Sequence, residues 1–172
     1  MTLTPAAPLA PPLKAETLAR FDKEVSKYPA DQKQSAVMAC LAIVQQVQGW
    51  VSAEAEAQIA AHLGMAAMAV HEVTTFYNMY NQQPVGQFKF NVCTNLPCQL
   101  RDGQQALDHL CHQLGIEVGG TTADGLFTVQ QSECLGACAD APVMLVNDRQ
   151  LISFMSNQRL DALIDTLKGQ AR

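Results

Sequence analysis

Residues 134–138 read CLGAC, which places two cysteines with three residues between them. Upstream, residues 93–98 read CTNLPC, a second pair with four residues between its members. The start of the chain has neither the basic segment nor the apolar segment of an export signal, so we expect a reducing compartment. There, clustered cysteines more often bind metal or carry out redox chemistry than form disulfides. The two pairs are therefore expected to organise the fold around them.

The residues around these pairs predict an α/β domain over 83–172. Alternation of apolar and polar residues over 88–93 predicts a strand that ends in Cys93. Asp102 is the expected N-cap of the next helix, with Gln105 in the capping-box position and Gly115 at its end. Further strands are predicted at 126–129, 143–146 and 151–154, and a last helix is predicted after Ser156. The order β-α-β-loop-β-β-α predicts a thioredoxin-like sandwich with a right-handed first crossover.

This order of elements brings both cysteine pairs to one end of the predicted sheet. Cys93 ends the first strand and Cys98 precedes the first helix, whereas Cys134 and Cys138 follow the second strand. Sheets of this kind carry their sites in the loops at the carboxyl ends of parallel strands. Four thiolates can bind a [2Fe–2S] cluster, two on each iron. We therefore predict that these four cysteines are the iron ligands.

A zinc site formed by the same four cysteines is the main alternative. Structural zinc sites usually have short paired spacings, and spacings of four and three intervening residues are looser. Four unligated thiols would require both pairs to reach one end of the sheet by chance. A thiol–disulfide catalyst would need a C-x-x-C motif at a helix start, and the sequence contains none.

The surroundings of the four cysteines are expected to stabilise negative charge, because a cluster with four thiolates is anionic and reduction adds to that charge. Gly136 lets its loop bend, and the backbone N–H groups of Leu135, Gly136 and Ala137 are expected to donate to sulfur. The positive end of the following helix and the charge of Arg101 would raise the reduction potential. The nearby carboxylates of Glu133 and Asp140 would lower it.

Residues 14–82 predict a four-helix bundle. The first helix is expected over 14–28 and the fourth over 66–80, the latter with Phe76, Tyr77 and Tyr80 on its apolar side. Residues 1–13 contain four prolines and predict a disordered or extended arm.

The two middle helices carry capping signals. Asp31, with Gln34 three residues later, is the expected N-cap of the second helix, which Gly49 ends. Ser52 is the expected N-cap of the third helix, which ends at Gly64. These signals place the turns of the predicted bundle.

Two further features of the sequence lie outside the predicted cluster. Cys40 and Cys111 fall on apolar helix faces, where a free cysteine usually packs as a small hydrophobe. Pro142 precedes the third strand of the predicted sandwich, a position where such folds often have a cis proline. The probability that the Ala141–Pro142 bond is cis is therefore expected to exceed the base rate of about 5–6% for X–Pro bonds.

Composition narrows the possible partners. The formal net charge of −5 argues against nucleic acid, which requires a basic face. The longest apolar run, residues 36–44, is shorter than the roughly 20 residues of a membrane span. We expect a cytoplasmic chain that does not itself insert into a membrane.

Several stretches together resemble the thioredoxin-like [2Fe–2S] ferredoxin subunits of the bacterial NADH:quinone oxidoreductases, the respiratory complex I enzymes. They are Gly49-Trp50-Val51, Thr75-Phe76-Tyr77, Pro84-Val85-Gly86, the segments 93–98, 124–128 and 133–138, and Ala141-Pro142. The resemblance covers nearly everything after the N-terminal arm. One departure is Leu151-Ile152, where many relatives are expected to have a tyrosine, and it affects only surface or partner contacts.

The resemblance implies a helical bundle followed by a thioredoxin-like ferredoxin domain, with one [2Fe–2S] cluster on Cys93, Cys98, Cys134 and Cys138. It implies a flavoprotein partner that binds NADH, FMN and a [4Fe–4S] cluster, and single-electron exchange between the flavin and this chain. The chain would be peripheral to the inner membrane within a translocase and would not oxidise NADH alone. The equivalent subunit of an NAD-linked hydrogenase or formate dehydrogenase is the alternative.

Overall fold

The computed structural model describes residues 12–170. Chain contacts divide it into two units after Pro84. The predicted arm over 1–13 lies almost entirely outside the described residues. Leu13, near its end, is buried, and its amide N–H donates to Gln58 Oε1 at 3.0 Å. The chain is therefore attached to the helical core before the first helix begins.

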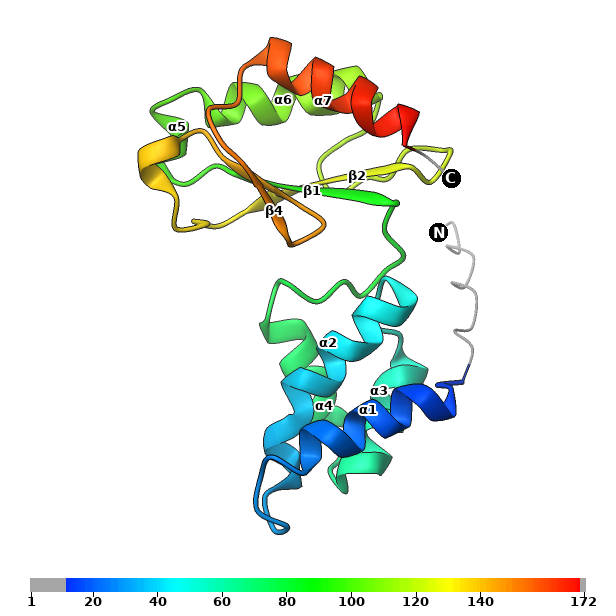
Figure 1. Cartoon of the computed structure of the whole chain (residues 1–172). Helices are drawn as coiled ribbons and strands as arrows, with labels where there is room; N and C mark the ends of the chain where they lie inside the picture. The colour runs from blue at the N-terminus through cyan, green and yellow to red at the C-terminus, as the bar shows by residue number, and fades with distance from the viewer. Residues whose placement is uncertain (1–11, 171–172) are drawn as a thin grey trace, which may run out of the picture. The chain divides into compact units, whose positions relative to one another are not determined.

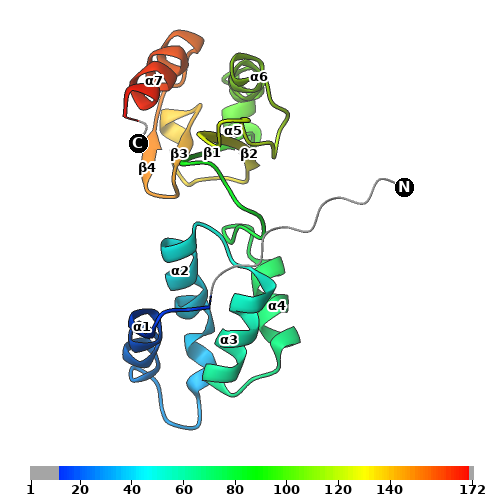
Figure 2. The same ribbon diagram turned by 90° about the vertical axis from the view of Figure 1, so that its right-hand side faces the viewer.

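Within residues 12–84, the first unit has four α-helices and one 3-10 helix, drawn in blue to green in Figures 1 and 2. They are α1 (Ala15–Val25), η1 (Lys33–Ala36), α2 (Val37–Gln48), α3 (Ala53–Leu63) and α4 (Ala67–Phe76). All contribute to one buried apolar cluster, whose largest fully buried side chains are Phe21, Leu41, Ile59, Val44 and Val70.

The turns between these helices follow the capping signals in part. Ser52 Oγ accepts a hydrogen bond from the Ala55 amide at 3.1 Å, so the predicted N-cap of α3 is confirmed. Gly49 and Gly64 end their helices in the left-handed region, at φ 82° and 67°. The predicted N-cap at Asp31 is wrong. An extra 3-10 turn precedes α2, and its Gln34 carbonyl accepts a hydrogen bond from the amide of Val37, the first residue of α2.

Helix α4 ends at Phe76, earlier than the predicted residue 80, because Tyr77 leaves the helical region. This exit lets Tyr80 turn into the core, where it is 5% exposed and its hydroxyl donates to the Met38 carbonyl at 3.0 Å. Phe76 is left on the surface with 79% of its area exposed. The single apolar side predicted for this helix is therefore divided between core and solvent.

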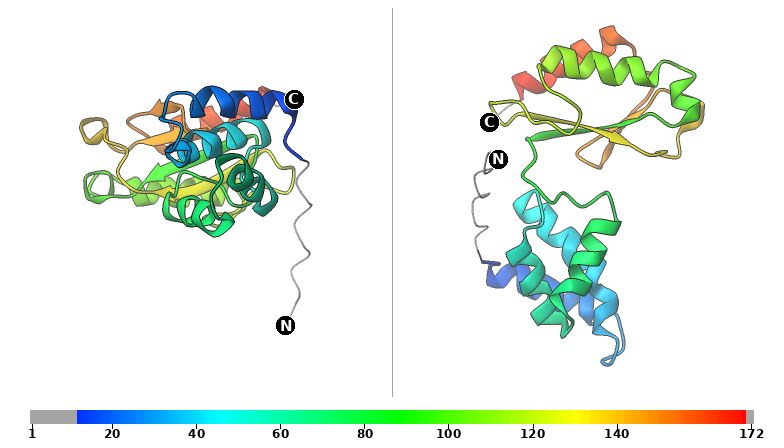
Figure 3. Two further views of the ribbon diagram at one scale, coloured as in Figure 1. Left: turned by 90° about the horizontal axis from the view of Figure 1, so that it is seen from below. Right: turned by 180° about the vertical axis from the view of Figure 1, so that it is seen from behind.

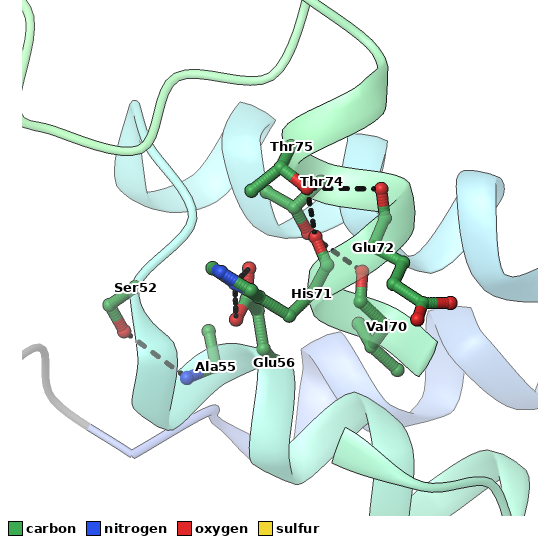
Figure 4. A network of polar contacts seen from close by, with 8 residues as sticks. All are labelled: Ser52, Ala55, Glu56, Val70, His71, Glu72, Thr74 and Thr75. Atoms are coloured by element: carbon green, nitrogen blue, oxygen red, sulfur yellow. Dashed lines mark hydrogen bonds and ion pairs between the residues drawn. The ribbon is translucent and has the colours of Figure 1, made fainter. Parts of the chain in front are cut away.

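A polar network links α3 to α4 inside this unit (Figure 4). The Glu56 carboxylate is buried and lies 3.0 Å from His71 Nδ1. The hydroxyls of Thr74 and Thr75 donate to backbone carbonyls one turn earlier, at 3.1 and 2.9 Å. Because each buried polar group has a partner, the network avoids the cost of isolated charge in the core.

The second unit is a four-stranded mixed sheet with helices on one face (Figures 1 and 2). Strand order is β2-β1-β3-β4, with β1 and β2 parallel and the other neighbours antiparallel. The elements are β1 (Phe88–Cys93), α5 (Leu96–Gln99), α6 (Gly103–Leu114), β2 (Phe127–Ser132), η2 (Cys138–Asp140), β3 (Met144–Val146), β4 (Gln150–Ile152) and α7 (Asn157–Gly169). This is the thioredoxin-like arrangement that the element order predicts.

Strand alternation determines which face of the sheet is covered. Phe90 and Val92 of β1 and Val129 of β2 are fully buried, in one cluster with the apolar stripes of α6 and α7. The β3–β4 turn is formed by Asn147 and Asp148, both with positive φ, as a tight hairpin requires.

The outer edge of β2 is covered by the chain that returns from α6. The Gly119 amide donates to the Val129 carbonyl at 2.7 Å, and the Val129 amide donates to the Gly120 carbonyl at 3.2 Å. The Thr122 amide donates to the Phe127 carbonyl at 2.8 Å. These bonds occupy backbone groups of Phe127 and Val129 on the side of β2 that faces away from β1.

Candidate metal centre

Strand register brings the two cysteine pairs together. Parallel pairing of β1 with β2 sets Cys93 opposite Ser132, the last residue of each strand. The loop that carries Cys134 and Cys138 therefore starts beside the loop that carries Cys98. Strand β3 runs in the opposite direction, and the Cys93 amide donates to the Val143 carbonyl at 3.1 Å just before that strand. Figure 3 shows α5 and the residue 133–140 loop at the same end of the sheet.

The two pairs differ in their exposure to solvent. Cys93 and Cys98 are each 1% exposed and share a small apolar cluster with Ala141 and Val143. Cys134 and Cys138 are exposed. The site thus has a buried side formed by one pair and a solvent-facing side formed by the other.

Within each pair the sulfurs are close. Cys134 Sγ and Cys138 Sγ lie 3.5 Å apart. With a metal–thiolate bond of about 2.3 Å, as in zinc sites, two sulfurs at that separation can share one ion. The Cys98 thiol hydrogen-bonds to Cys93 and lies near enough to Cys138 to sense its charge. The thiols are therefore arranged two by two, with contact between the pairs.

Crowding and burial make two of these thiols harder to ionise. Burial is the main cause of the raised pKa of Cys98, and a backbone hydrogen bond from Val143 partly opposes it. The pKa of Cys138 is raised chiefly by its hydrogen bond to Cys134. A bound cation would reverse this preference, because it stabilises thiolates directly.

The four cysteines offer the number of thiolates that a cluster of two irons requires. Among residues 12–170, no group of three or more His, Cys, Asp or Glu side chains is placed to hold a single metal ion. A [2Fe–2S] cluster needs two thiolates at each iron, with sulfides between the irons. The pairs Cys93–Cys98 and Cys134–Cys138 match that demand in number and grouping.

Side chains also connect the two cysteine loops. Asn95 Nδ2 donates to Glu133 Oε2 at 2.6 Å, and Gln131 Nε2 donates to Thr94 Oγ1 at 2.6 Å. Asn95 was not among the residues predicted from the sequence, and Glu133 was expected to act only as a charge. No local sequence signal identifies this contact, because it depends on the parallel register of β1 and β2.

The residues predicted to surround the four cysteines differ in what they contact. The Gly136 amide donates to Cys134 Sγ at 3.4 Å, and Gly136 has φ 77°. Leu135 and Ala137 pack against the buried cysteine cluster. Arg101 is exposed and lines a pocket of about 440 Å³ beside Pro142.

The predicted capping box before α6 is wrong in detail. Asp102 is the N-cap residue, but its carboxylate accepts from the Gln105 side chain at 3.1 Å and makes no bond to the helix amides. The first residue of α6, Gly103, lies directly against the C-x4-C loop. A Cβ there would fall 2.8 Å from the Cys98 carbonyl oxygen. Neither this packing nor the one-turn helix α5, which contains Cys98, was predicted from the sequence.

The predictions for Cys40, Cys111 and Pro142 are confirmed. Cys40 is fully buried in the helical core, and Cys111 is partly buried against the core of the second unit. Burial raises the pKa of Cys40 to about 12. The Ala141–Pro142 bond is cis.

Comparison with known proteins identifies the family. The family model for thioredoxin-like [2Fe-2S] ferredoxins matches residues 21–168. The chain belongs to this family. Membership in the thioredoxin-like [2Fe-2S] ferredoxin family supports one [2Fe–2S] cluster.

Named relatives cover most of the chain. NADH-quinone oxidoreductase subunit 2 of Thermus thermophilus is 38% identical over 152 residues, 88% of this chain and 84% of that protein. An NADH-quinone oxidoreductase subunit of Rhizobium meliloti is 37% identical over 152 residues, 88% of this chain and 89% of that protein.

A solved structure shares the fold. A chain of an NAD+-reducing [NiFe]-hydrogenase in the air-oxidized state matches with a TM-score of 0.69 and 23% identity. The match covers 80% of this ferredoxin-family chain and only 23% of the hydrogenase chain.

Proposed function

We propose that this chain is the electron-transfer subunit of an NADH:quinone oxidoreductase and that it carries one [2Fe–2S] cluster. The observation that carries the proposal is the register of β1 with β2, which sets two cysteine pairs at one end of the sheet. The named relatives support the enzyme context. When bound, such a cluster accepts and releases single electrons.

The residues around the proposed cluster would have three roles: they would bind iron, exclude water and offset negative charge. Cys93, Cys98, Cys134 and Cys138 are the proposed ligands. The apolar groups of Ala141 and Val143 exclude water from the buried pair. The Gly136 N–H, already directed at Cys134 Sγ, would offset part of the negative charge on that side.

The electron partner that we propose is a flavoprotein subunit that binds NADH and FMN. Leu96, inside the C-x4-C segment, and Leu100, at the C-cap of α5, are both exposed and would be covered by that partner. Within residues 12–170, no helix is both long and apolar enough to cross a bilayer. From the named relatives, we place the chain at the membrane periphery, as part of the complex.

We also propose separate roles for the two units. Residues 83–172 would form the redox domain, and residues 14–82 would form a four-helix bundle used in docking. Large apolar side chains on the surface of the helical unit support this assignment: Val47, Met68, Phe76 and Met79 are 44–79% exposed. Exposed apolar side chains of this size are typical of interaction surfaces.

The decisive test is low-temperature electron paramagnetic resonance of the anaerobically purified, dithionite-reduced full chain, with iron and acid-labile sulfide measured on the same sample. Equal iron and sulfide with a [2Fe–2S] signal would support the assignment. Zinc in place of iron, and no signal after reconstitution, would leave the fold intact but remove the electron-transfer function.

The fold likeness to the NAD+-reducing hydrogenase chain favours a second candidate, the equivalent subunit of an NAD-linked hydrogenase or formate dehydrogenase. Affinity purification of the chain from its own cells distinguishes the two. Quinone-reducing complex subunits would co-purify in the first case, and hydrogenase or formate dehydrogenase subunits in the second.

A further inference from the structure

We propose that the hydrogen bond between Asn95 and Glu133, here called the Asn95–Glu133 clasp, positions the two cysteine loops for the cluster. The inference rests on the proposed function, because it assigns a role to residues next to the proposed ligands. Asn95 lies between Cys93 and Cys98, and Glu133 directly precedes Cys134. Asn95 Nδ2 donates to Glu133 Oε2 at 2.6 Å, beyond the Gln131–Thr94 bond and the bond from the Thr94 amide to the Ser132 carbonyl.

The location of the clasp matters because strand pairing stops just before it. Cys93 and Ser132 form the last pair of the β1–β2 ladder. Beyond Ser132, the next tie across the loops is Asn95 to Glu133, one residue from Cys134. The far end of the loop is held where the Phe154 amide donates to the Asp140 carbonyl at 2.9 Å. The clasp is thus the near anchor of the C-x3-C loop.

The chemistry of Asn95 points to the same role. Asn95 occupies the N-cap position of α5, where an asparagine usually accepts a hydrogen bond from the helix amides. Its side chain makes no such bond and reaches across to Glu133 instead. A carboxylate acceptor makes the clasp a charge-assisted hydrogen bond, which is stronger than a neutral one.

Electrostatics alone does not explain Glu133. A negative carboxylate beside thiolates opposes an anionic cluster. Glu133 is also exposed, so water weakens its interaction with other charges. What Glu133 does provide is a carboxylate oxygen that accepts the hydrogen bond from Asn95. Asn95 and Glu133 are therefore positioning residues that act through the loops and not through contact with the electron path.

The test compares the full chain with three variants: Asn95→Ala, which removes the clasp; Glu133→Gln, which keeps an acceptor oxygen and removes the charge; and Gln104→Ala as a matched control. Gln104 Nε2 donates to Asp108 Oδ1 at 2.9 Å, an exposed amide–carboxylate bond within α6. The measurements are iron release to excess EDTA, the midpoint potential, and the line shape of the reduced paramagnetic resonance spectrum.

Asn95→Ala should release iron about 10-fold faster than the wild type and broaden the spectrum, as loss of a partner next to a ligand usually does. Glu133→Gln should release iron at a rate between those of the wild type and Asn95→Ala, because a neutral acceptor keeps a weaker bond. It should also shift the potential upward, because a negative charge is gone. Gln104→Ala should match the wild type in all three. If Asn95→Ala behaves like Gln104→Ala, the clasp has no positioning role.

The same variants keep the inference testable if the chain holds no iron. In the metal-free chain, amide hydrogen exchange over residues 133–138 should be faster in Asn95→Ala than in Gln104→Ala, with unchanged far-UV circular dichroism. Equal exchange would overturn the clasp by itself. A wild-type chain without any cluster would instead overturn the proposed function, so the two failures are distinct.

Discussion

Cysteine has two different environments in this chain. Cys40 packs inside the helical core, where burial raises its thiol pKa to about 12. Cys134 sits in a solvent-facing loop, 3.5 Å from the sulfur of Cys138 and with the Gly136 amide directed at it. The same side chain therefore serves as a packing group in one place and as a proposed ligand in the other.

Replacing each cysteine with serine separates these roles. Cys134→Ser should abolish or strongly perturb the cluster signal while most of the helix content remains, because Cys134 is not part of a core. Cys40→Ser should keep the signal and lose about 1–3 kcal/mol of unfolding free energy, since it buries a hydroxyl. Paramagnetic resonance and circular dichroism measure both. Identical behaviour of the two variants would contradict the ligand assignment.

The buried thiol of Cys40 also predicts how stability depends on pH. Its pKa is raised from 9.0 to about 12 in the folded chain. Below about pH 9 both states hold the proton, so stability is unaffected. Above it, only the unfolded state loses the proton, and stability falls by about 1.4 kcal/mol per pH unit until about pH 12.

Urea unfolding of the wild type and of Cys40→Ala, in reductant between about pH 8 and pH 10.5, isolates this effect. Other groups titrate equally in both chains, so the stability difference between them should shrink as pH rises. A difference that stays constant with pH would show that Cys40 does not titrate as its burial requires.

Among the elements, the start of α6 packs closely against the C-x4-C loop because Gly103 has no side chain. Gly103 faces the Cys98 and Cys93 carbonyl oxygens, which a Cβ would approach to 2.8 and 3.0 Å. Both contacts are with backbone, which cannot move aside as a flexible side chain does. The helix can approach the cysteine loop this closely only because the residue is glycine.

Gly103→Ala should therefore destabilise the second unit by about 1–3 kcal/mol, the usual cost of overpacking, and reduce cluster retention. Gly169→Ala is the matched control: Gly169 also lies in a helix, and nothing is within 4 Å of its added Cβ. Urea unfolding and cluster absorbance report the two effects. Equal stability of the two variants would argue against close packing at Gly103.

Elements with a local signal were predictable from the sequence, and those that depend on distant contacts were not. The alternation before Cys93 and the cap at Ser52 are local, and both predictions hold. The predicted cap at Asp31 failed, because a 3-10 turn intervenes. The predicted end of α4 failed because Tyr80 reaches Met38, a contact that no local pattern reveals.

The same distinction applies to the candidate site. Spacing and element order were enough to predict that the four cysteines lie at one end of the sheet. The contacts of Asn95 with Glu133 and of Gly103 with Cys98 depend on the register of β1 with β2 and on how α6 packs. Neither the register nor this packing is encoded in residue spacing.

For the whole molecule, the exposed apolar side chains of the helical unit are predicted to contribute to partner binding but little to folding stability. Phe76 was expected on a buried helix side, yet it is 79% exposed and packs edge-to-face on Tyr77. A side chain so exposed contributes little to folding, and removing it should change the unfolding free energy by less than about 0.5 kcal/mol.

Phe76→Ser should weaken binding to the proposed flavoprotein subunit by about 10-fold or more, since aromatic anchors dominate interfaces. The cluster signal should not change. Tyr28→Ser, at an aromatic residue that is 40% exposed after α1, is the control and should bind normally. Titration calorimetry with the co-expressed partner measures both affinities. Full binding by Phe76→Ser would exclude this surface from docking.

The chain that returns along β2 has a consequence for handling the protein. Open sheet edges invite other chains to add a strand, which leads to aggregates and fibres. The outward backbone groups of Phe127 and Val129 in β2 already bond to Gly119, Gly120 and Thr122. At the other edge, β4 spans only three residues, too short a template for stable strand addition. We expect concentrated solutions to resist fibril formation until the 119–122 segment detaches.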